Sequence, residues 1–213
     1  MITIYEKGLC QMSKAILLST KPKYVADILN GKKIIEIRKQ MPKCDLPIDV
    51  YIYCTKNGET LTYLVNGKNE IVDFTTVSKN NKYIKRNYNG KVVAKFTLRK
   101  VEEIETSRNE PFMLGCYKTK TMYEPELLRL SCLGFRELDN YLRYKNGCAW
   151  HIEDLVIFDK PKELSEFRKP STLSLKQLQE FGLPYDEKTY KEMATKGKRF
   201  ITKAPQNYCF VEV

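Results

Sequence analysis

The stretch from Ser19 to Lys39 constrains the fold of this chain more than any other, because it encodes a helix, its end and a following strand in one short run. Pro22 suits the first turn of a helix, and Ser19 or Thr20 is the expected cap. Apolar residues then recur at helical spacing as far as Gly31. Glycine ends helices readily because it adopts the left-handed conformation without strain, so the helix is expected to stop there.

After Gly31 the period of the sequence changes from that of a helix to that of a strand. Ile35 and Ile37 point to one side of the expected strand, and Glu36 and Arg38 point to the other. The pattern therefore predicts an amphipathic helix beside an amphipathic strand whose polar face carries a carboxylate and a guanidinium. The plainest interpretation of that face is a solvated ion pair, which contributes little to stability.

The same residues resemble the signature of a known family. Ser-x-Lys-Pro, a short helix and then Gly-Lys-Lys-x-x-Glu-x-Arg-Lys are similar to the ASCH domain, a branch of the PUA-like superfamily. The resemblance covers Lys14 to Lys39 and returns at Ala204-Pro-Gln-Asn-Tyr-Cys-Phe-Val-Glu. It implies an α+β fold, a PUA-like mixed β-barrel with flanking helices, and an association with RNA and modified nucleotides.

Strand and helix patterns in the rest of the chain fit one such domain over residues 14–213, with residues 1–13 as an N-terminal extension. Residues 14–19 predict a central apolar strand, and residues 48–55 alternate as a second strand. The turn signal at Asn57-Gly58 predicts that residues 59–65 return as its hairpin partner. Regular strand–helix alternation is absent, which argues against a doubly wound sheet.

Two longer segments complete this domain. Residues 91–104 form the longest strand-like run, and Lys91, Lys95 and Arg99 fall on one of its faces, where they could form a basic strip. Apolar residues between 106 and 147 recur at helical intervals. We therefore expect a helical insertion around residues 106–147.

The charge balance is the clearest compositional feature. The chain has 37 Lys and Arg against 26 Asp and Glu, a net charge of +11. Such an excess favours a polyanionic partner, and nucleic acid is the expected one. The family resemblance makes RNA the preferred partner over DNA. No apolar run approaches the roughly 20 residues of a membrane span, and no basic amphipathic helix or secretory signal is evident, so a cytoplasmic protein without a membrane partner is expected.

Cysteine and histidine usage argues against a metal centre. The seven cysteines include no Cys-x-x-Cys pair, and His151 is the single histidine. Structural zinc sites depend on closely spaced ligand pairs, so neither a metal nor another cofactor is expected. Apolar neighbours around Trp150 and His151 favour structural roles for both residues.

The basic and acidic residues of the helix–strand unit are the first candidates for a binding site. Lysine and arginine side chains bind phosphate, and arginine can also pair with a base edge. A glutamate can orient that arginine or accept from an exocyclic amine. The resemblance implies that nucleic acid or an extruded base enters the cleft beside this unit, and it gives as candidates Ser19, Lys21, Pro22, Lys33, Glu36, Arg38 and Gln206. Tyr83 and Arg86 are added because aromatic and basic residues interleave between residues 78 and 90, a pattern that suits single-stranded nucleic acid.

Two other functions stay open at this stage. Some ASCH-like proteins are amidohydrolases on N4-acetylcytidine and resemble this chain at Gly31, Lys33 and Arg38, but their threonine nucleophile corresponds to Glu36 here. A carboxylate does not replace a hydroxyl as acyl acceptor without different chemistry. Other members are linked to RNA cleavage, for which Lys33 and Glu36 are the candidate acid–base residues. The second alternative is a protein-binding regulator that acts through residues 106–147.

Overall fold

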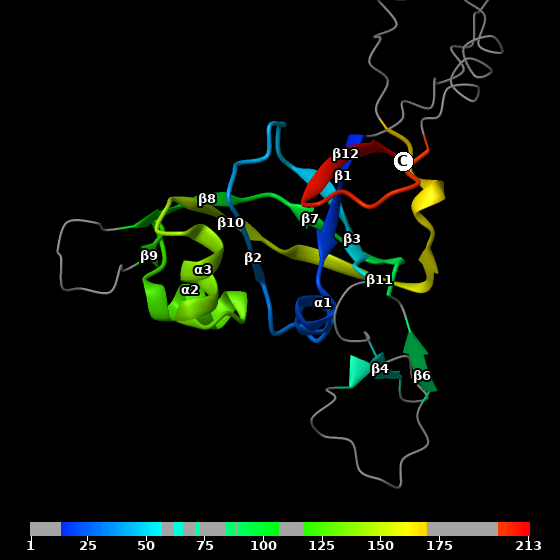
Figure 1. The fold of residues 1–213 in the computed structure, drawn as a ribbon, viewed down its shortest axis with the longest axis horizontal. Coiled ribbons are helices and arrows are strands. Elements are labelled where there is room, and N and C mark those ends of the chain that lie inside the picture. The colour runs from blue at the N-terminus through cyan, green and yellow to red at the C-terminus, as the bar shows by residue number, and fades with distance from the viewer. Residues whose placement is uncertain are drawn as a thin grey trace, which may run out of the picture.

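The structure is a computed structural model that describes residues 14–56, 62–65, 71–72, 84–87, 89–106, 117–169 and 200–213. It combines helices with three β-sheets (Figure 1), so the α+β class is confirmed. The strand orders of the two larger sheets run from one edge to another, and no closed barrel is found among the described strands. The expected barrel is therefore not confirmed.

The largest sheet has five strands and holds the first predicted strand in its interior. Its order is β11-β7-β3-β1-β12. β1 pairs in parallel with β3 and antiparallel with β12, and every residue from Ala15 to Thr20 is buried. The prediction of a central apolar strand is thus confirmed. The strands are β1 (Lys14–Thr20), β3 (Ile48–Cys54), β7 (Val92–Leu98), β11 (Glu153–Lys162) and β12 (Tyr208–Glu212).

Helix α1 (Pro22–Leu29) follows β1 directly and packs on this sheet. Pro22 occupies its first turn and Gly31 has a φ of +69° just beyond its end, as the sequence predicts. The predicted cap is wrong. Lys21 is the N-cap residue and makes no side-chain capping bond, because Ser19 and Thr20 still belong to β1.

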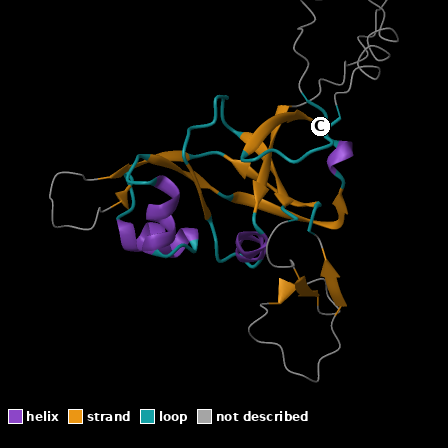
Figure 2. Ribbon diagram, in the orientation of Figure 1, coloured by secondary structure: helices purple, strands orange, loops and turns teal. Residues whose placement is uncertain are grey.

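The second sheet has four strands in the order β2-β10-β8-β9 and carries the other two helices. Figure 2 shows both helices at one end of the molecule, alongside this sheet. Together they enclose a second apolar core, which includes Ile35, Ile37, Tyr117, Leu127 and Leu138. The elements are β2 (Ile35–Arg38), β8 (Val101–Thr106), β9 (Tyr117–Lys118), β10 (Gly147–His151), α2 (Glu124–Ser131) and α3 (Phe135–Leu142).

A small third sheet corrects the hairpin prediction. β4 (Thr62–Val65) pairs with β5 (Ile71–Val72) and β6 (Ile84–Asn87), whereas both edges of β3 are taken by β1 and β7. Of the predicted return strand 59–65, the described part, Thr62–Val65, is therefore not paired with β3, and residues 59–61 lie outside the described residues. A turn signal is local, and it does not say which strand competes for the neighbouring edge.

The single strand predicted over residues 91–104 is also wrong, because the chain forms β7 and β8 in different sheets. Exposed Arg99 and Lys100 separate the two strands. The alternation of apolar residues ends at Leu98, because Lys100 stands where the next apolar residue would fall. The sequence therefore does carry a mark of this break. Helices α2 and α3 lie within the segment 106–147 predicted to be helical, and residues 107–116 of that segment are outside the described residues.

Candidate functional site

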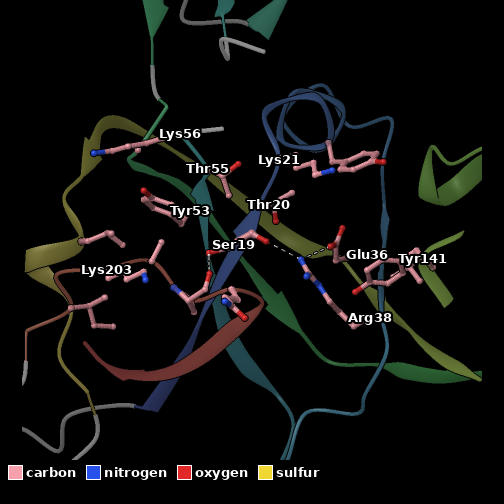
Figure 3. Close-up of a pocket in the computed structure, with 18 of the residues that line it drawn as sticks. Ser19, Thr20, Lys21, Glu36, Arg38, Tyr53, Thr55, Lys56, Tyr141 and Lys203 are labelled. Atoms are coloured by element: carbon pink, nitrogen blue, oxygen red, sulfur yellow. Dashed lines mark hydrogen bonds and ion pairs between the residues drawn. The ribbon is translucent and has the colours of Figure 1, made fainter. Parts of the chain in front are cut away.

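A pocket of about 1280 Å³ opens beside the helix–strand unit that the sequence singles out (Figure 3). It is lined by the end of β1, by α1, β2 and α3, by Thr55 and Lys56 just after β3, and by residues 201–206 ahead of β12. These segments are distant in sequence. The pocket brings together six of the predicted site residues, namely Ser19, Lys21, Lys33, Glu36, Arg38 and Gln206.

The floor of the pocket is built on a buried group of three charges. Glu36 Oε1 lies 2.6 Å from Arg38 Nη2, and Glu36 Oε2 lies 3.3 Å from Lys33 Nζ. The three residues are only 2% to 7% exposed. The expectation of a solvated pair on β2 is therefore wrong, since both faces of this strand are covered.

Three fixed partners hold the cations of this group. Lys33 Nζ donates to the carbonyl of Ser131, 2.7 Å away at the last residue of α2, where the helix dipole favours a cation. Arg38 Nη1 donates to Asn207 Oδ1 at 2.5 Å, and Nη2 donates to the carbonyl of Ser19 at 3.2 Å. The floor is thus anchored to three separate parts of the fold.

Electrostatics keep Glu36 ionised. Burial by itself raises the pKa of this carboxyl group, but the charges of Lys33 and Arg38 and their hydrogen bonds outweigh burial and hold the pKa below its ordinary value. The group is consequently a carboxylate at neutral pH, and one of the two buried cations is left without a compensating charge. The floor carries a net charge of +1.

Three buried side-chain polar atoms have no hydrogen-bond partner within the described residues; one, Nε1 of Trp150, lies outside the pocket lining, and the other two belong to lining residues. These two are the hydroxyl oxygen of Thr20, which is 3% exposed, and Nε of Arg38. Buried polar groups are nearly always hydrogen-bonded, so two unpartnered atoms on residues that line one pocket need an explanation. In contrast, the neighbouring Ser19 hydroxyl donates to the carbonyl of Pro205 at 2.7 Å.

Three lysines around the pocket are available to a ligand. Lys21, Lys56 and Lys203 are exposed, and none forms an ion pair with another described residue. The two exposed carboxylates of the lining have other partners. Glu137 lies 3.0 Å from Lys23 Nζ, and Glu163 pairs with Lys91. The rim is therefore positive.

Tyrosine side chains flank the floor. Figure 3 places Tyr53 and Tyr141 on opposite sides of the Ser19–Arg38 contact, and Tyr24 also lines the pocket. Burial raises the pKa of Tyr141 and of Tyr53, so both hydroxyl groups stay protonated at neutral pH. Tyr53 is only 4% exposed and packs in an apolar core, whereas the half-buried ring of Tyr141 is open enough to stack on a planar ligand.

Other predicted residues do not reach the pocket as described. Pro22 is buried in the first turn of α1 and is not among the lining residues. Tyr83 lies outside the described residues, and of Arg86 only the backbone in β6 is described. The lysines and arginine of the expected basic strip are each paired with a carboxylate, Lys91 with Glu163, Lys95 with Asp49, and Arg99 with Glu153 and Asp154.

His151 and Trp150 also lie away from the pocket lining. Trp150 is fully buried in the apolar core that α1 shares with the five-stranded sheet, and it packs on Tyr208 with ring centroids 5.3 Å apart. His151 Nε2 lies 3.2 Å from Glu102 Oε2, in a network that also contains Lys100, Thr119 and Thr121. Among the described residues no cluster of potential ligands could hold a metal ion.

Sequence reasoning missed several lining residues. Thr20 lies inside the Ser-x-Lys-Pro motif and could have been selected from it. Tyr53, Lys56, Tyr141 and Lys203 carry no local signal, because only the tertiary fold brings their segments to the pocket.

A comparison with protein-family models identifies the family of this chain. The family model described as ASCH domain matches residues 18–162. The chain belongs to the ASCH domain family. This family is generally associated with RNA binding. The match includes the end of β1, α1 and β2, which form one side and the floor of the pocket.

Solved structures similar to this ASCH domain come from Zymomonas mobilis. They are the ASCH protein of that organism (15% identity, 91% of this chain and 85% of that chain, TM-score 0.41) and two variants of it. One variant has a tyrosine-to-phenylalanine change (14%, 91% and 87%, TM-score 0.44), and the other has a serine-to-alanine change (14%, 91% and 85%, TM-score 0.44). No curated protein matches the chain. Of the helices in the described part, none has the length and apolar character needed to cross a bilayer.

Proposed function

We propose that this ASCH domain binds RNA or a modified nucleotide in the pocket beside α1 and β2. The observation that carries the proposal is the set of three exposed lysines, Lys21, Lys56 and Lys203, around the pocket that the family signature lines. Of the described lining residues, five are cations and three are carboxylates, which leaves two net positive charges. A positive concave surface attracts a polyanion and raises its association rate.

The pocket divides its charges between two roles. The three rim lysines are point charges without described ion-pair partners, so they serve as phosphate contacts. Lys33 and Arg38 are committed to Glu36 and to backbone or amide oxygens, so they shape the floor. We treat residues 14–213 as one domain in which the helical segment 106–147 is an insertion that supplies Tyr141 and Glu137 to the pocket.

Hydrolysis of RNA or of a modified nucleoside is the second candidate. The observation that favours it is the buried ion pair of Lys33 and Glu36 in a pocket wall, since buried carboxylates with a shifted pKa gather at catalytic sites. In that case the Glu36 carboxylate would accept a proton and Lys33 would donate one. Incubation of bound RNA with wild type and Glu36→Gln tests it. Because Glu36→Gln also leaves Lys33 and Arg38 unpaired, circular dichroism must first show that the variant is folded under the assay conditions. Loss of cleavage in the folded variant supports hydrolysis, and intact RNA with wild-type protein argues against it.

The test of the binding function is fluorescence anisotropy with labelled single-stranded RNA, duplex RNA and duplex DNA across a salt series. The variant Lys21→Ala/Lys56→Ala/Lys203→Ala removes the rim charges. A matched control, Lys120→Ala/Lys145→Ala/Lys160→Ala, removes three exposed lysines that do not line the pocket. The salt slope is the slope of log affinity against log salt concentration, and each lost phosphate contact lowers its magnitude by about 0.7 on a single strand. The slope of the rim variant should therefore be smaller in magnitude by about 2.

The control decides how the result is interpreted. If the control keeps wild-type affinity while the rim variant binds weakly, the pocket is the binding site. If both variants weaken binding equally, the attraction comes from the net charge of the whole chain and the proposal fails. If no nucleic acid binds, a protein partner becomes the next candidate.

A further inference from the structure

The floor of the pocket contains hydrogen-bonding capacity that the fold itself does not use. The hydroxyl of Thr20 and Nε of Arg38 are both buried and both lack a partner within the described residues. Leaving a buried donor or acceptor unsatisfied is unfavourable by about 1–3 kcal/mol. Two such atoms on lining residues of one pocket indicate groups kept for a ligand.

The geometry around Arg38 limits what that ligand can be. Both terminal nitrogens of its guanidinium are already donors, Nη1 to Asn207 and Nη2 to Glu36 and the Ser19 carbonyl. These bonds use three of the four terminal N–H groups, and the side chain of Tyr141 also hydrogen-bonds Arg38. The N–H of Nε is therefore the one without a partner among the described residues. Strong phosphate binding by arginine uses two parallel N–H groups, so this arginine is not set up to clamp a phosphate.

The position of the Glu36 carboxylate leads to the same conclusion. The Glu36 carboxylate lies 2.6 Å from Arg38 Nη2 and is ionised, so an anionic group placed at Arg38 would come close to a like charge. A neutral acceptor, such as a carbonyl oxygen or a ring nitrogen, meets no such repulsion. Each Glu36 oxygen also keeps a lone pair for an N–H of the ligand beyond its contacts with Lys33 and Arg38.

Together these groups offer the Nε donor of Arg38, the two carboxylate oxygens of Glu36 as acceptors, and the Thr20 hydroxyl, which can donate or accept. Planar Tyr141 and Tyr53 flank them (Figure 3). Within a nucleic acid, the part that is neutral, planar and edged by adjacent donors and acceptors is the base. Its edge is free only when the base is unpaired, because pairing in a duplex already uses it.

We propose that Thr20 and Arg38 Nε recognise the polar edge of one unpaired nucleobase at the pocket floor, while the lysines at the rim hold the adjoining phosphates. This inference rests on the proposed function and adds that the base is the part of the ligand that the pocket floor recognises. Both atoms are buried, so their use by a ligand requires movement of the side chains that cover them. The pocket therefore selects single-stranded over duplex RNA.

The experiment separates base recognition from phosphate binding. Labelled single-stranded RNA is compared with the same strand lacking its bases at the internal positions, for wild type, Thr20→Val and Thr20→Ser. Valine has the shape of threonine without the hydroxyl, and serine keeps the hydroxyl. Loss of one hydrogen bond corresponds to about a three- to tenfold weaker affinity.

The expected result has three parts. Wild type binds the base-bearing strand more tightly than the abasic one. Thr20→Val loses about three- to tenfold on the base-bearing strand alone, with an unchanged salt slope, and Thr20→Ser stays near wild type. Thermal melting confirms that both variants are folded.

Two results overturn the inference while the proposed function survives. One is equal affinity of wild type for base-bearing and abasic strands, and the other is wild-type affinity of Thr20→Val for both. In either case the loss of binding in the Lys21/Lys56/Lys203 variant would still identify the pocket as a phosphate site. If wild type binds neither strand, the proposed function fails and this inference fails with it.

Discussion

Glu36 Oε1 lies 2.6 Å from Nη2 of Arg38, two residues further along the same face of β2, and both residues are less than 10% exposed. Strand geometry alone puts residues i and i+2 on one face, so the sequence creates the pair. What the fold adds is its burial beneath a pocket, together with Lys33. The pair therefore belongs to the interior, where its energetics differ from those of a surface ion pair.

Glu36→Gln should destabilise the protein strongly. The change leaves two buried cations, Lys33 and Arg38, facing an uncharged amide. Breaking a buried ion pair by removing one partner typically destabilises by about 3–5 kcal/mol. Urea denaturation followed by circular dichroism measures the change in the free energy of unfolding.

The matched control is Glu163→Gln, which breaks the exposed contact with Lys91. Exposed pairs contribute about 0–1 kcal/mol, so this variant should unfold close to wild type. Equal losses from the two substitutions would contradict the assignment of a special role to the buried group.

The pH dependence of stability should report on the same carboxyl group. The folded pKa of Glu36 lies below its unfolded value of about 4.3, so its contribution is present above that value and is lost as the pH falls through the folded pKa. Denaturation at several pH values between neutral and strongly acidic measures this loss. Glu36→Gln should show a shallower decline than wild type, although both proteins keep the depressed pKa values of Glu102 and Glu137. Parallel declines would rule out Glu36 as a contributor.

The sequence predicted those parts of the fold that depend on neighbouring residues. The helix from Pro22, its end at Gly31 and the alternation of β2 follow from local spacing and are present. Strand pairing is different, because it depends on competition between distant segments. β7 pairs with the edge of β3 where the hairpin partner was expected, and no local sequence pattern predicts that pairing.

The residues of the site also fall into two groups, those that local sequence predicts and those that depend on distant segments. Six predicted residues line one pocket, because they come from the helix–strand unit and the closing segment that resemble the family. Burial could not be predicted for Lys33, since its cover is the end of α2, which lies about a hundred residues further along the chain. Tyr141 and Lys203 reach the pocket for the same non-local reason.

Thr20→Val should raise stability. The hydroxyl is buried without a partner within the described residues, and its replacement by a methyl group removes that penalty, while valine suits a strand. We expect a gain of about 1 kcal/mol in the free energy of unfolding. Thr119→Val is the control, because the Thr119 hydroxyl contacts Glu102 and accepts from the N–H of Met122. That variant should lose about 2 kcal/mol. A loss in both variants would mean that Thr20 already has a partner.

Glu137 should stabilise the fold more through its hydrogen bond with the backbone of Gly134 than through its ion pair with Lys23. Its Oε2 accepts from the backbone N–H of Gly134 at 2.8 Å, and its Oε1 lies 3.0 Å from Lys23 Nζ on α1. Glu137→Ala removes both contacts and should lower stability by about 1–2 kcal/mol, whereas Glu137→Gln keeps an acceptor for Gly134 and should lose about half as much. Thermal melts of the two variants measure the difference. Equal losses would assign the effect to the Lys23 ion pair.

His151→Gln should leave nucleic-acid binding unchanged. The imidazole does not line the pocket and contacts Glu102, whose carboxylate also accepts from Thr119 and Thr121 and pairs with Lys100. Because these partners remain, the variant should lose no more than about 1 kcal/mol of stability. Anisotropy titrations beside the rim-lysine variant give the comparison. A loss of affinity in His151→Gln similar to that of the rim variant would move the binding surface from the α1–β2 pocket to the face of β8 and β10, and it would reopen a catalytic role for the single histidine.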